Sequence, residues 1–203
     1  MSIEAYTSDE LLSIFDLCQN GSRALGPGLR YVIWTQGCPF RCVGCVTPSS
    51  RPIVNEKLVR VDELAADILS RHNIDGITIS GGEPFLQAGA LANMLDIVLK
   101  TQPKLSVITY TGYKLEELTG DNERKLLNHL DLLIDGPYMK DLNDNKGIRG
   151  SSNQRLHFLT SRLLPWKEEF QKGARKVEVH LVNEKIKAIG VPPVDLTTYT
   201  EFN

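Results

Sequence analysis

The sequence predicts an α/β fold with parallel strands, and three observations support this class. From about residue 30 onward, short apolar runs rich in β-branched residues alternate with segments whose apolar residues recur at helical spacing. The connections between successive strands are long enough to hold a helix, as right-handed crossovers between parallel strands require. Four of the expected strands end in glycine-rich or polar sequence, where ligands bind in such folds. An open doubly wound sheet and a full or partial (β/α) barrel both satisfy this order.

The individual elements follow from local patterns along the chain. The first strand is expected at 30–36, and the first helix of the alternation at 61–71, where Val61, Leu64 and Ile68 share one face. The remaining elements are expected as a strand at 76–80, a helix at 91–100, a strand at 104–111, a helix at 123–130, a strand at 131–136 and a weaker strand at 155–160.

The 203 residues are expected to form a single domain, because they contain no internal repeat, low-complexity tract or domain boundary. Residues 1–25 are predicted to form an N-terminal helical extension, with Cys18 buried on its apolar face. Residues 26–160 are predicted to form the core, and residues 161–203 a C-terminal helix and hairpin. The two strands of this hairpin are expected at 176–182 and 185–191, joined through Asn183 and Glu184.

Composition and charge limit the classes of function. The chain has 23 basic and 25 acidic residues, a net charge of −2 and no polybasic run, so non-specific nucleic-acid binding is not expected. No apolar stretch is long enough to span a bilayer, and the acidic, amphipathic N-terminus lacks the pattern of a signal peptide. We therefore expect a cytoplasmic protein without a membrane partner, in a compartment where thiols stay reduced.

Three of the four cysteines, Cys38, Cys42 and Cys45, stand within eight positions directly after the first expected strand. Tetrahedral zinc needs a fourth ligand, and neither Cys18 nor any of the four histidines stands at a usual zinc-finger spacing. A redox dithiol would use only Cys42 and Cys45. An iron–sulfur cluster held by three thiolates keeps one iron open for a small molecule. The incomplete ligand set favours this third chemistry over zinc and over a dithiol.

The other candidate residues stand at the ends of the next three strands. The carboxyl ends of parallel strands meet at one edge of a sheet, so these residues are expected to lie near the cysteines. Asp135 closes an otherwise apolar strand, where a carboxylate requires a partner. The candidates are Gly81, Gly82, Glu83 and Pro84 after the second strand, Thr111 and Gly112 after the third, and Asp135 at the end of the fourth.

Several motifs resemble one enzyme superfamily when taken together. The CxxxCxxC spacing in "TQGCPFRCVGC" resembles the radical S-adenosylmethionine (SAM) superfamily. "GPGLR" at 26–30, followed by this motif, is similar to the N-terminal region of glycyl-radical-enzyme activases, and "SGGEP" at 80–84 resembles the superfamily's GGEP motif. "YTGY" at 110–113, "DLLIDGPY" at 131–138 and "RGSSNQR" at 149–155 resemble the activases of anaerobic ribonucleotide reductase.

The resemblance implies a fold, two cofactors and a reaction. The fold is a partial (β/α)6-type parallel barrel with the cluster at the carboxyl-terminal rim of the strands. Cys38, Cys42 and Cys45 would hold one [4Fe-4S] cluster, whose open iron binds SAM. Reductive cleavage of SAM to a 5′-deoxyadenosyl radical would then lead to hydrogen abstraction from the substrate, while the protein supplies positioning. The cofactor-binding residues implied are Gly81, Gly82, Glu83, Pro84, Thr111, Gly112 and Asp135.

The same resemblance implies the partners. The substrate would be a glycyl radical enzyme such as anaerobic ribonucleotide reductase, and the electrons would come from a flavodoxin or a ferredoxin-like donor. Two alternatives stay open. One is a radical SAM enzyme that acts on a peptide or small molecule, with the C-terminal hairpin closing the mouth of the site. The other is a non-catalytic zinc or iron–sulfur binding protein.

The sequence departs from the superfamily near the third cysteine. Many members have an aromatic residue just before this cysteine, where it packs on the adenine, but this chain has Gly44. The ribonucleotide reductase activases have an aromatic residue just after the cysteine, where this chain has Val46. Phe40 or Tyr113 is therefore the expected replacement.

Overall fold

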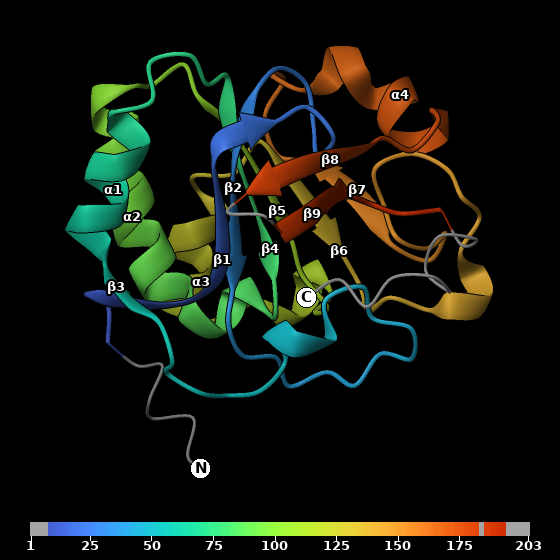
Figure 1. Ribbon diagram of the computed structural model, residues 1–203, viewed down its shortest axis with the longest axis horizontal. Coiled ribbons are helices and arrows are strands. Elements are labelled where there is room, and N and C mark those ends of the chain that lie inside the picture. Colours follow the sequence, from blue (N-terminus) through green and yellow to red (C-terminus); the bar gives the residue numbers. More distant parts are fainter. Residues whose placement is uncertain (1–7, 183–184, 194–203) are drawn as a thin grey trace.

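A seven-stranded mixed β-sheet forms the centre of the computed structural model, which describes residues 8–182 and 185–193 (Figure 1). The strands stand in the order β3-β1-β2-β4-β5-β6-β7. Their bounds are β1 (Leu11–Ser22), β2 (Arg30–Thr35), β3 (Leu58–Arg60), β4 (Gly76–Gly81), β5 (Ser106–Tyr110), β6 (Leu132–Asp135) and β7 (Arg155–Phe158). The predicted α/β class is confirmed.

The four central strands β2, β4, β5 and β6 run parallel to their neighbours, as predicted from the helix-length connections between them. On one side, β1 pairs antiparallel with both β2 and β3. On the other side, β7 pairs antiparallel with β6. The parallel part of the described sheet thus has four strands, with antiparallel strands on either side, and their carboxyl ends share one edge.

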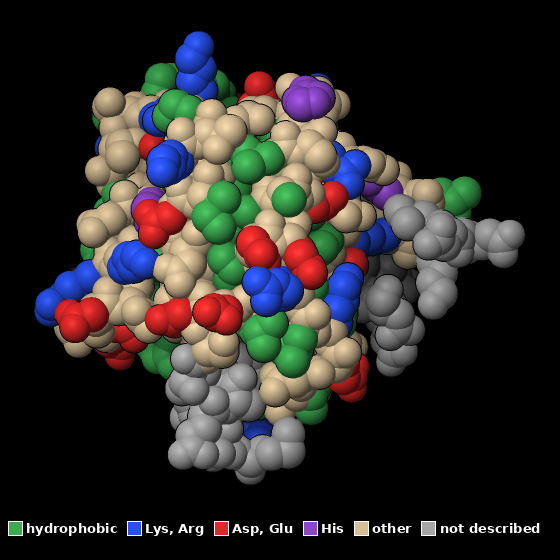
Figure 2. Space-filling model, turned by 90° about the vertical axis from the view of Figure 1, so that its left-hand side faces the viewer, with side chains coloured by type: hydrophobic (Ala, Val, Ile, Leu, Met, Phe, Trp, Pro, Cys, Tyr) green, Lys and Arg blue, Asp and Glu red, His purple; other side chains and the backbone are tan. Residues whose placement is uncertain are grey.

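Helices α1 (Val61–Leu69), α2 (Ala88–Thr101) and α3 (Asp121–Leu127) cover one face of the sheet, on the left of Figure 1. The apolar side chains of these helices pack together with the sheet in one core cluster, which includes the buried Leu64 and Leu91. Burial of each such side chain contributes about 1.5–3 kcal/mol. Acidic and basic side chains are intermixed on the outer surface of this side (Figure 2), in keeping with the near-neutral charge of the chain. None of the described helices combines the length and apolar character needed to cross a membrane.

The helix predicted over residues 1–25 is wrong, because residues 11–22 of this segment form strand β1. Residues 1–7 lie outside the described residues. This segment forms a strand because β1 supplies hydrogen-bonding partners along the edge of β2, which would otherwise be unpaired on that side. A helix over the same residues would leave those backbone groups without these partners.

Irregular pairing explains why β1 resembles a helix in its sequence. The pairing of β1 with β2 shifts register between Ile14 and Asp16 and again between Cys18 and Ser22. Such irregularities interrupt the alternation of inward and outward side chains, which is the main signal of a strand. Cys18 is buried, as predicted, but it lies on a strand and packs near Trp34.

The predicted C-terminal hairpin is confirmed as β8 (Val177–Val182) paired antiparallel with β9 (Lys185–Gly190), and helix α4 (Lys167–Lys172) precedes it. The turn residues 183–184 lie outside the described residues. The hairpin covers the sheet face that points away from α1–α3 (Figure 1). Ile189 of β9 joins a cluster with Trp34.

Candidate active site

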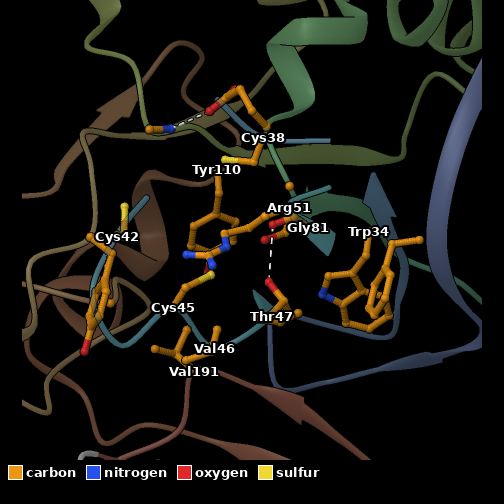
Figure 3. A pocket seen from close by; sticks show the side chains of 18 of the residues that line it. Trp34, Cys38, Cys42, Cys45, Val46, Thr47, Arg51, Gly81, Tyr110 and Val191 are labelled. Atoms are coloured by element: carbon orange, nitrogen blue, oxygen red, sulfur yellow. Dashed lines mark hydrogen bonds between the residues drawn. The ribbon is translucent and has the colours of Figure 1, made fainter. Parts of the chain in front are cut away.

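The carboxyl ends of the parallel strands border a cavity of about 230 Å³ (Figure 3). The residues that follow β2, β4, β5 and β6 form one side, and residues of β1 and β9 form another. The parallel order of the strands therefore brings distant parts of the sequence to one site, as expected from their shared edge. The predicted residues that line the cavity are Cys38, Cys42, Cys45, Gly81, Gly82, Glu83, Pro84, Thr111 and Gly112.

The clustered cysteines lie in the loop after β2, and their thiols are free of disulfide bonds. The loop closes on itself, because Cys38 N donates a hydrogen bond to Arg51 O at 3.0 Å. Figure 3 shows Cys38, Cys42 and Cys45 arranged around the cavity. The structure thus places these three side chains at one cavity, and their role as cluster ligands stays a prediction.

The thiols fit an iron–sulfur cluster by their chemistry. Burial raises the pKa of Cys38 to about 11, and burial also raises the pKa of Cys42, against the opposing effects of a backbone hydrogen bond from Tyr138 and, to a smaller extent, of the Arg51 guanidinium. Binding of a thiophilic metal therefore releases protons from these groups. Within residues 8–182 and 185–193, no three Cys, His, Asp or Glu side chains are grouped as ligands of a single metal ion. Three thiols spread around a cavity match a cluster in which each thiolate binds a different iron.

Backbone conformation explains the glycine that precedes the third cysteine. Gly44 has a φ of 74°, in the left-handed region that L-residues rarely adopt. A Cβ atom at this position would meet nothing closer than the Lys140 side chain, 3.3 Å away. Glycine is therefore favoured by φ rather than by lack of space, and an aromatic residue at position 44 would be strained. Phe40 lines the cavity, and its ring meets the ring of Tyr113 edge to face, with 4.9 Å between the ring centroids. Tyr113 itself is not among the lining residues.

The glycine pair Gly81 and Gly82, at the carboxyl end of β4, packs against backbone. A Cβ atom on Gly82 would overlap the carbonyl oxygen of Gly37 and lie 2.9 Å from that of Ser50. The backbone of this turn is also bound to the cysteine loop, since Glu83 N donates to Gly37 O at 2.7 Å. The glycines thus let the end of β4 approach the cysteine loop, and their contact with a cofactor stays a prediction.

Glu83 connects the ends of two strands. Its buried carboxylate accepts hydrogen bonds from Phe85 N at 3.0 Å, from Thr111 Oγ1 at 2.8 Å and from Gly112 N at 2.7 Å. These bonds hold the turn after β5 against the turn after β4. Burial raises the pKa of Glu83 to about 7, although the three hydrogen bonds oppose the shift. The carboxylate thus has a direct role in shaping the cavity.

The raised pKa of Glu83 predicts that stability falls as the pH rises from 4.5 to 7. The usual pKa of 4.5 applies in the unfolded chain, so in this window the folded protein holds a proton that unfolding releases. The free energy of unfolding of the apoprotein is expected to fall by about 3 kcal/mol across the window through this group. Urea unfolding at a series of pH values measures the slope. Glu83→Gln is expected to remove it, and an unchanged slope in this variant would assign it to other groups.

Asp135 lies outside the cavity. Its buried carboxylate accepts from Leu115 N at 2.7 Å and from Arg155 Nε at 3.0 Å, and His157 Nε2 lies 3.0 Å from it. Burial opposes ionisation, but these partners hold the pKa of Asp135 below its usual range. The next residue, Gly136, does line the cavity. The structure therefore places Asp135 behind the site, and its predicted contact with the cofactor stays a prediction.

Several lining residues are absent from the sequence prediction. Arg51 belongs to the cysteine loop, and only its place six residues after Cys45 pointed to the site. Lys187 of β9 lies 4.9 Å over the ring of Trp34, and its Nζ is 2.5 Å from Asp16 Oδ2. These contacts fix the hairpin to the sheet at the cavity, and no local motif indicates them.

Comparisons with known proteins agree with the geometry of this site. The family model described as "4Fe-4S single cluster domain" matches residues 24–157. A protein of Enterobacteria phage T4, named anaerobic ribonucleoside-triphosphate reductase-activating protein, is 35% identical over 149 residues, which cover 71% of this chain and 92% of the phage protein. Proteins of the same name from Salmonella typhi and Escherichia coli (strain K12) are 33% and 32% identical, and each match covers 66% of this chain and 91% of the relative.

Among solved structures, the crystal structure of QueE from Escherichia coli aligns with a TM-score of 0.42 and 19% identity, covering 50% of this chain and 53% of that one. A likeness of this size carries no conclusion. The sequence matches do, because they span the cysteine loop and the ends of all four parallel strands. This chain belongs to the 4Fe-4S single cluster domain family and, with it, to the family of the anaerobic ribonucleoside-triphosphate reductase-activating proteins.

Proposed function

We propose that the chain is a radical SAM enzyme that installs a glycyl radical on a partner protein, with anaerobic ribonucleotide reductase as the partner. The observation that carries the proposal is the placement of three free thiols, Cys38, Cys42 and Cys45, around one cavity at the strand ends. Three thiolates bind three irons of a [4Fe-4S] cluster. When bound and reduced by one electron, the cluster and SAM supply a 5′-deoxyadenosyl radical that abstracts a hydrogen atom from the substrate.

The residues of the chain position these groups and exclude water. In this proposal, the part of the cavity that contacts SAM consists of Gly81, Gly82, Glu83, Pro84, Thr111 and Gly112. Phe40 is the candidate for packing on the adenine, because it lines the cavity, and Tyr113 supports it from the side. Asp135 does not line the cavity, and its hydrogen bonds with Leu115 N and Arg155 Nε hold the end of β6 in place beside it. The four parallel strands and their antiparallel neighbours correspond in this proposal to the partial (β/α)6-type barrel of the superfamily.

The electron donor is proposed to be a flavodoxin or a ferredoxin-like protein in the cytoplasm. The chain has four cysteines, and three of them are assigned to the one cluster. The fourth, Cys18, is buried on β1 and is not among the residues that line the cavity. A separate protein as the electron source is in keeping with this assignment of the cysteines.

Electron paramagnetic resonance tests the proposal. The chain, reconstituted anaerobically with iron and sulfide and then reduced, is incubated with SAM and an anaerobic ribonucleotide reductase. A glycyl radical doublet is expected, together with 5′-deoxyadenosine and methionine in the products. The reductase with a Gly→Ala change at its radical site serves as the control and is expected to give no doublet. Cleavage of SAM without a doublet from the intact reductase would contradict glycyl radical formation on this partner.

The C-terminal hairpin favours a second candidate, a radical SAM enzyme that acts on a peptide or small molecule. Strands β8 and β9 lie outside the residues that the family model matches, yet Ile186, Lys187 and Ala188 line the cavity. The hairpin is held by Lys187 and by Glu178, which accepts from Ser22 Oγ at 2.6 Å. An added boundary of this kind suits a substrate enclosed within the cavity. Cleavage of SAM that depends on a peptide or metabolite fraction, without a glycyl radical on the reductase, would support it.

A further inference from the structure

One basic side chain that lines the cavity has no anionic partner among the described residues. Apart from cysteines and tyrosines, the described ionisable residues that line the cavity are Asp16, Arg51, Glu83 and Lys187. Lys187 pairs with Asp16, and Glu83 is occupied by its three donors. The described chain forms no hydrogen bond or ion pair with the Arg51 guanidinium. Arg51 is therefore a cation at the cavity whose guanidinium is not engaged by the described residues.

The backbone of Arg51 is fixed to the cysteine loop. Its carbonyl oxygen accepts from Cys38 N at 3.0 Å, and its N–H donates to Pro48 O at 3.2 Å. The side chain extends from this anchored position into the cavity, among the labelled cysteines and Tyr110 (Figure 3). Because the loop carries both the cysteines and Arg51, the backbone of Arg51 is held close to any group that the thiols bind, and the guanidinium can reach that group.

A partly buried guanidinium without a partner is a site for an anion, and its planar fork matches a carboxylate. The proposed function, on which this inference rests, brings one carboxylate into the cavity, that of the methionyl group of SAM. We propose that Arg51 binds this carboxylate and so positions SAM against the cluster. A second source of negative charge is the cluster with its three thiolates, and the experiment below separates the two.

The test measures ligand binding by the anaerobically reconstituted holoprotein. Arg51→Gln and Arg51→Lys are compared with the wild type at equal iron and sulfide content, by calorimetric titration with SAM and with decarboxylated SAM. The Kd for SAM is expected to rise about 10- to 100-fold in Arg51→Gln and by less in Arg51→Lys, which keeps the charge but loses the fork. The Kd for decarboxylated SAM is expected to stay the same in all three proteins.

Arg41→Gln is the matched control, because Arg41 belongs to the same loop but is exposed and is not among the lining residues. It is expected to bind both ligands as the wild type does.

Equal SAM affinity in the wild type and Arg51→Gln would overturn the inference and leave the proposed function intact. So would a shifted reduction potential of the cluster without SAM, at unchanged SAM affinity, since that result assigns Arg51 to the cluster. If Arg51→Gln does not assemble a cluster, Arg51→Lys decides by the same criteria. A wild-type holoprotein that does not bind SAM would refute both.

Discussion

Replacement of Cys42 by alanine is expected to abolish the brown chromophore of the reconstituted protein and the cleavage of SAM. Among the residues that the structure describes, Cys42 is one of three thiols that line the cavity, and loss of one leaves two thiolates for a cluster that requires at least three. Iron and sulfide content, visible absorption and the yield of 5′-deoxyadenosine measure the result. Activity is expected to drop to the background of protein without iron.

Cys18→Ala is the matched control for this prediction. Cys18 lies on β1, buried near Val32 and Trp34, so its removal leaves a small cavity and costs about 1 kcal/mol. The cluster and SAM cleavage are expected to persist in this variant. Loss of the cluster in Cys18→Ala would mean that the ligand set is wrong. A colourless wild-type protein that contains one zinc and takes up no iron would instead support the non-catalytic metal-binding alternative.

The parts of the fold that were predictable depend on local patterns, and the others depend on contacts between distant segments. The apolar stripe of α2 is buried as predicted, since helical spacing alone determines which face meets the sheet. The strand β1 was not predictable from its spacing, because its pairing with β2 contains two shifts of register. The three-residue strand β3 has no local signal either. It exists through pairing of Leu58 with Ser13 and of Val59 with Leu12.

The same distinction applies to the site. Cys38, Cys42 and Cys45 are close in the chain, so one loop after β2 suffices to bring them to the cavity. Asp135, in contrast, stands at a strand end as predicted, but Arg155 is directly opposite it on β7 and binds its carboxylate. The role of Lys187 depends on packing of the hairpin against β1, where its Nζ donates to Leu17 O at 2.9 Å. Strand order and spacing do not contain this information.

Gly82→Ala is expected to lower the free energy of unfolding by about 3 kcal/mol and to prevent normal cluster assembly. The added methyl group would overlap the carbonyl oxygen of Gly37 and lie 2.7 Å from its carbonyl carbon. Both atoms belong to backbone that cannot rotate away. Relief requires the end of β4 and the cysteine loop to separate, which breaks the 2.7 Å hydrogen bond from Glu83 N to Gly37 O. Because Gly37 directly precedes Cys38, the separation also displaces a predicted cluster ligand.

Gly44→Ala provides the contrast that identifies the mechanism. At position 44 the strain comes from φ, while the nearest atom to an added Cβ is the flexible Lys140 side chain at 3.3 Å. This variant is expected to lose about 1 kcal/mol and to assemble the cluster. Urea unfolding of the apoproteins and iron content after reconstitution measure both variants. If Gly82→Ala is as stable as Gly44→Ala and binds a full complement of iron, the close approach of β4 to the cysteine loop does not control the site. If only Gly82→Ala loses stability and iron, the main role of Gly82, the second glycine of the GGEP motif, is to let the backbone of the cysteine loop pack against β4. A contact between Gly82 and SAM is then not needed to explain the result.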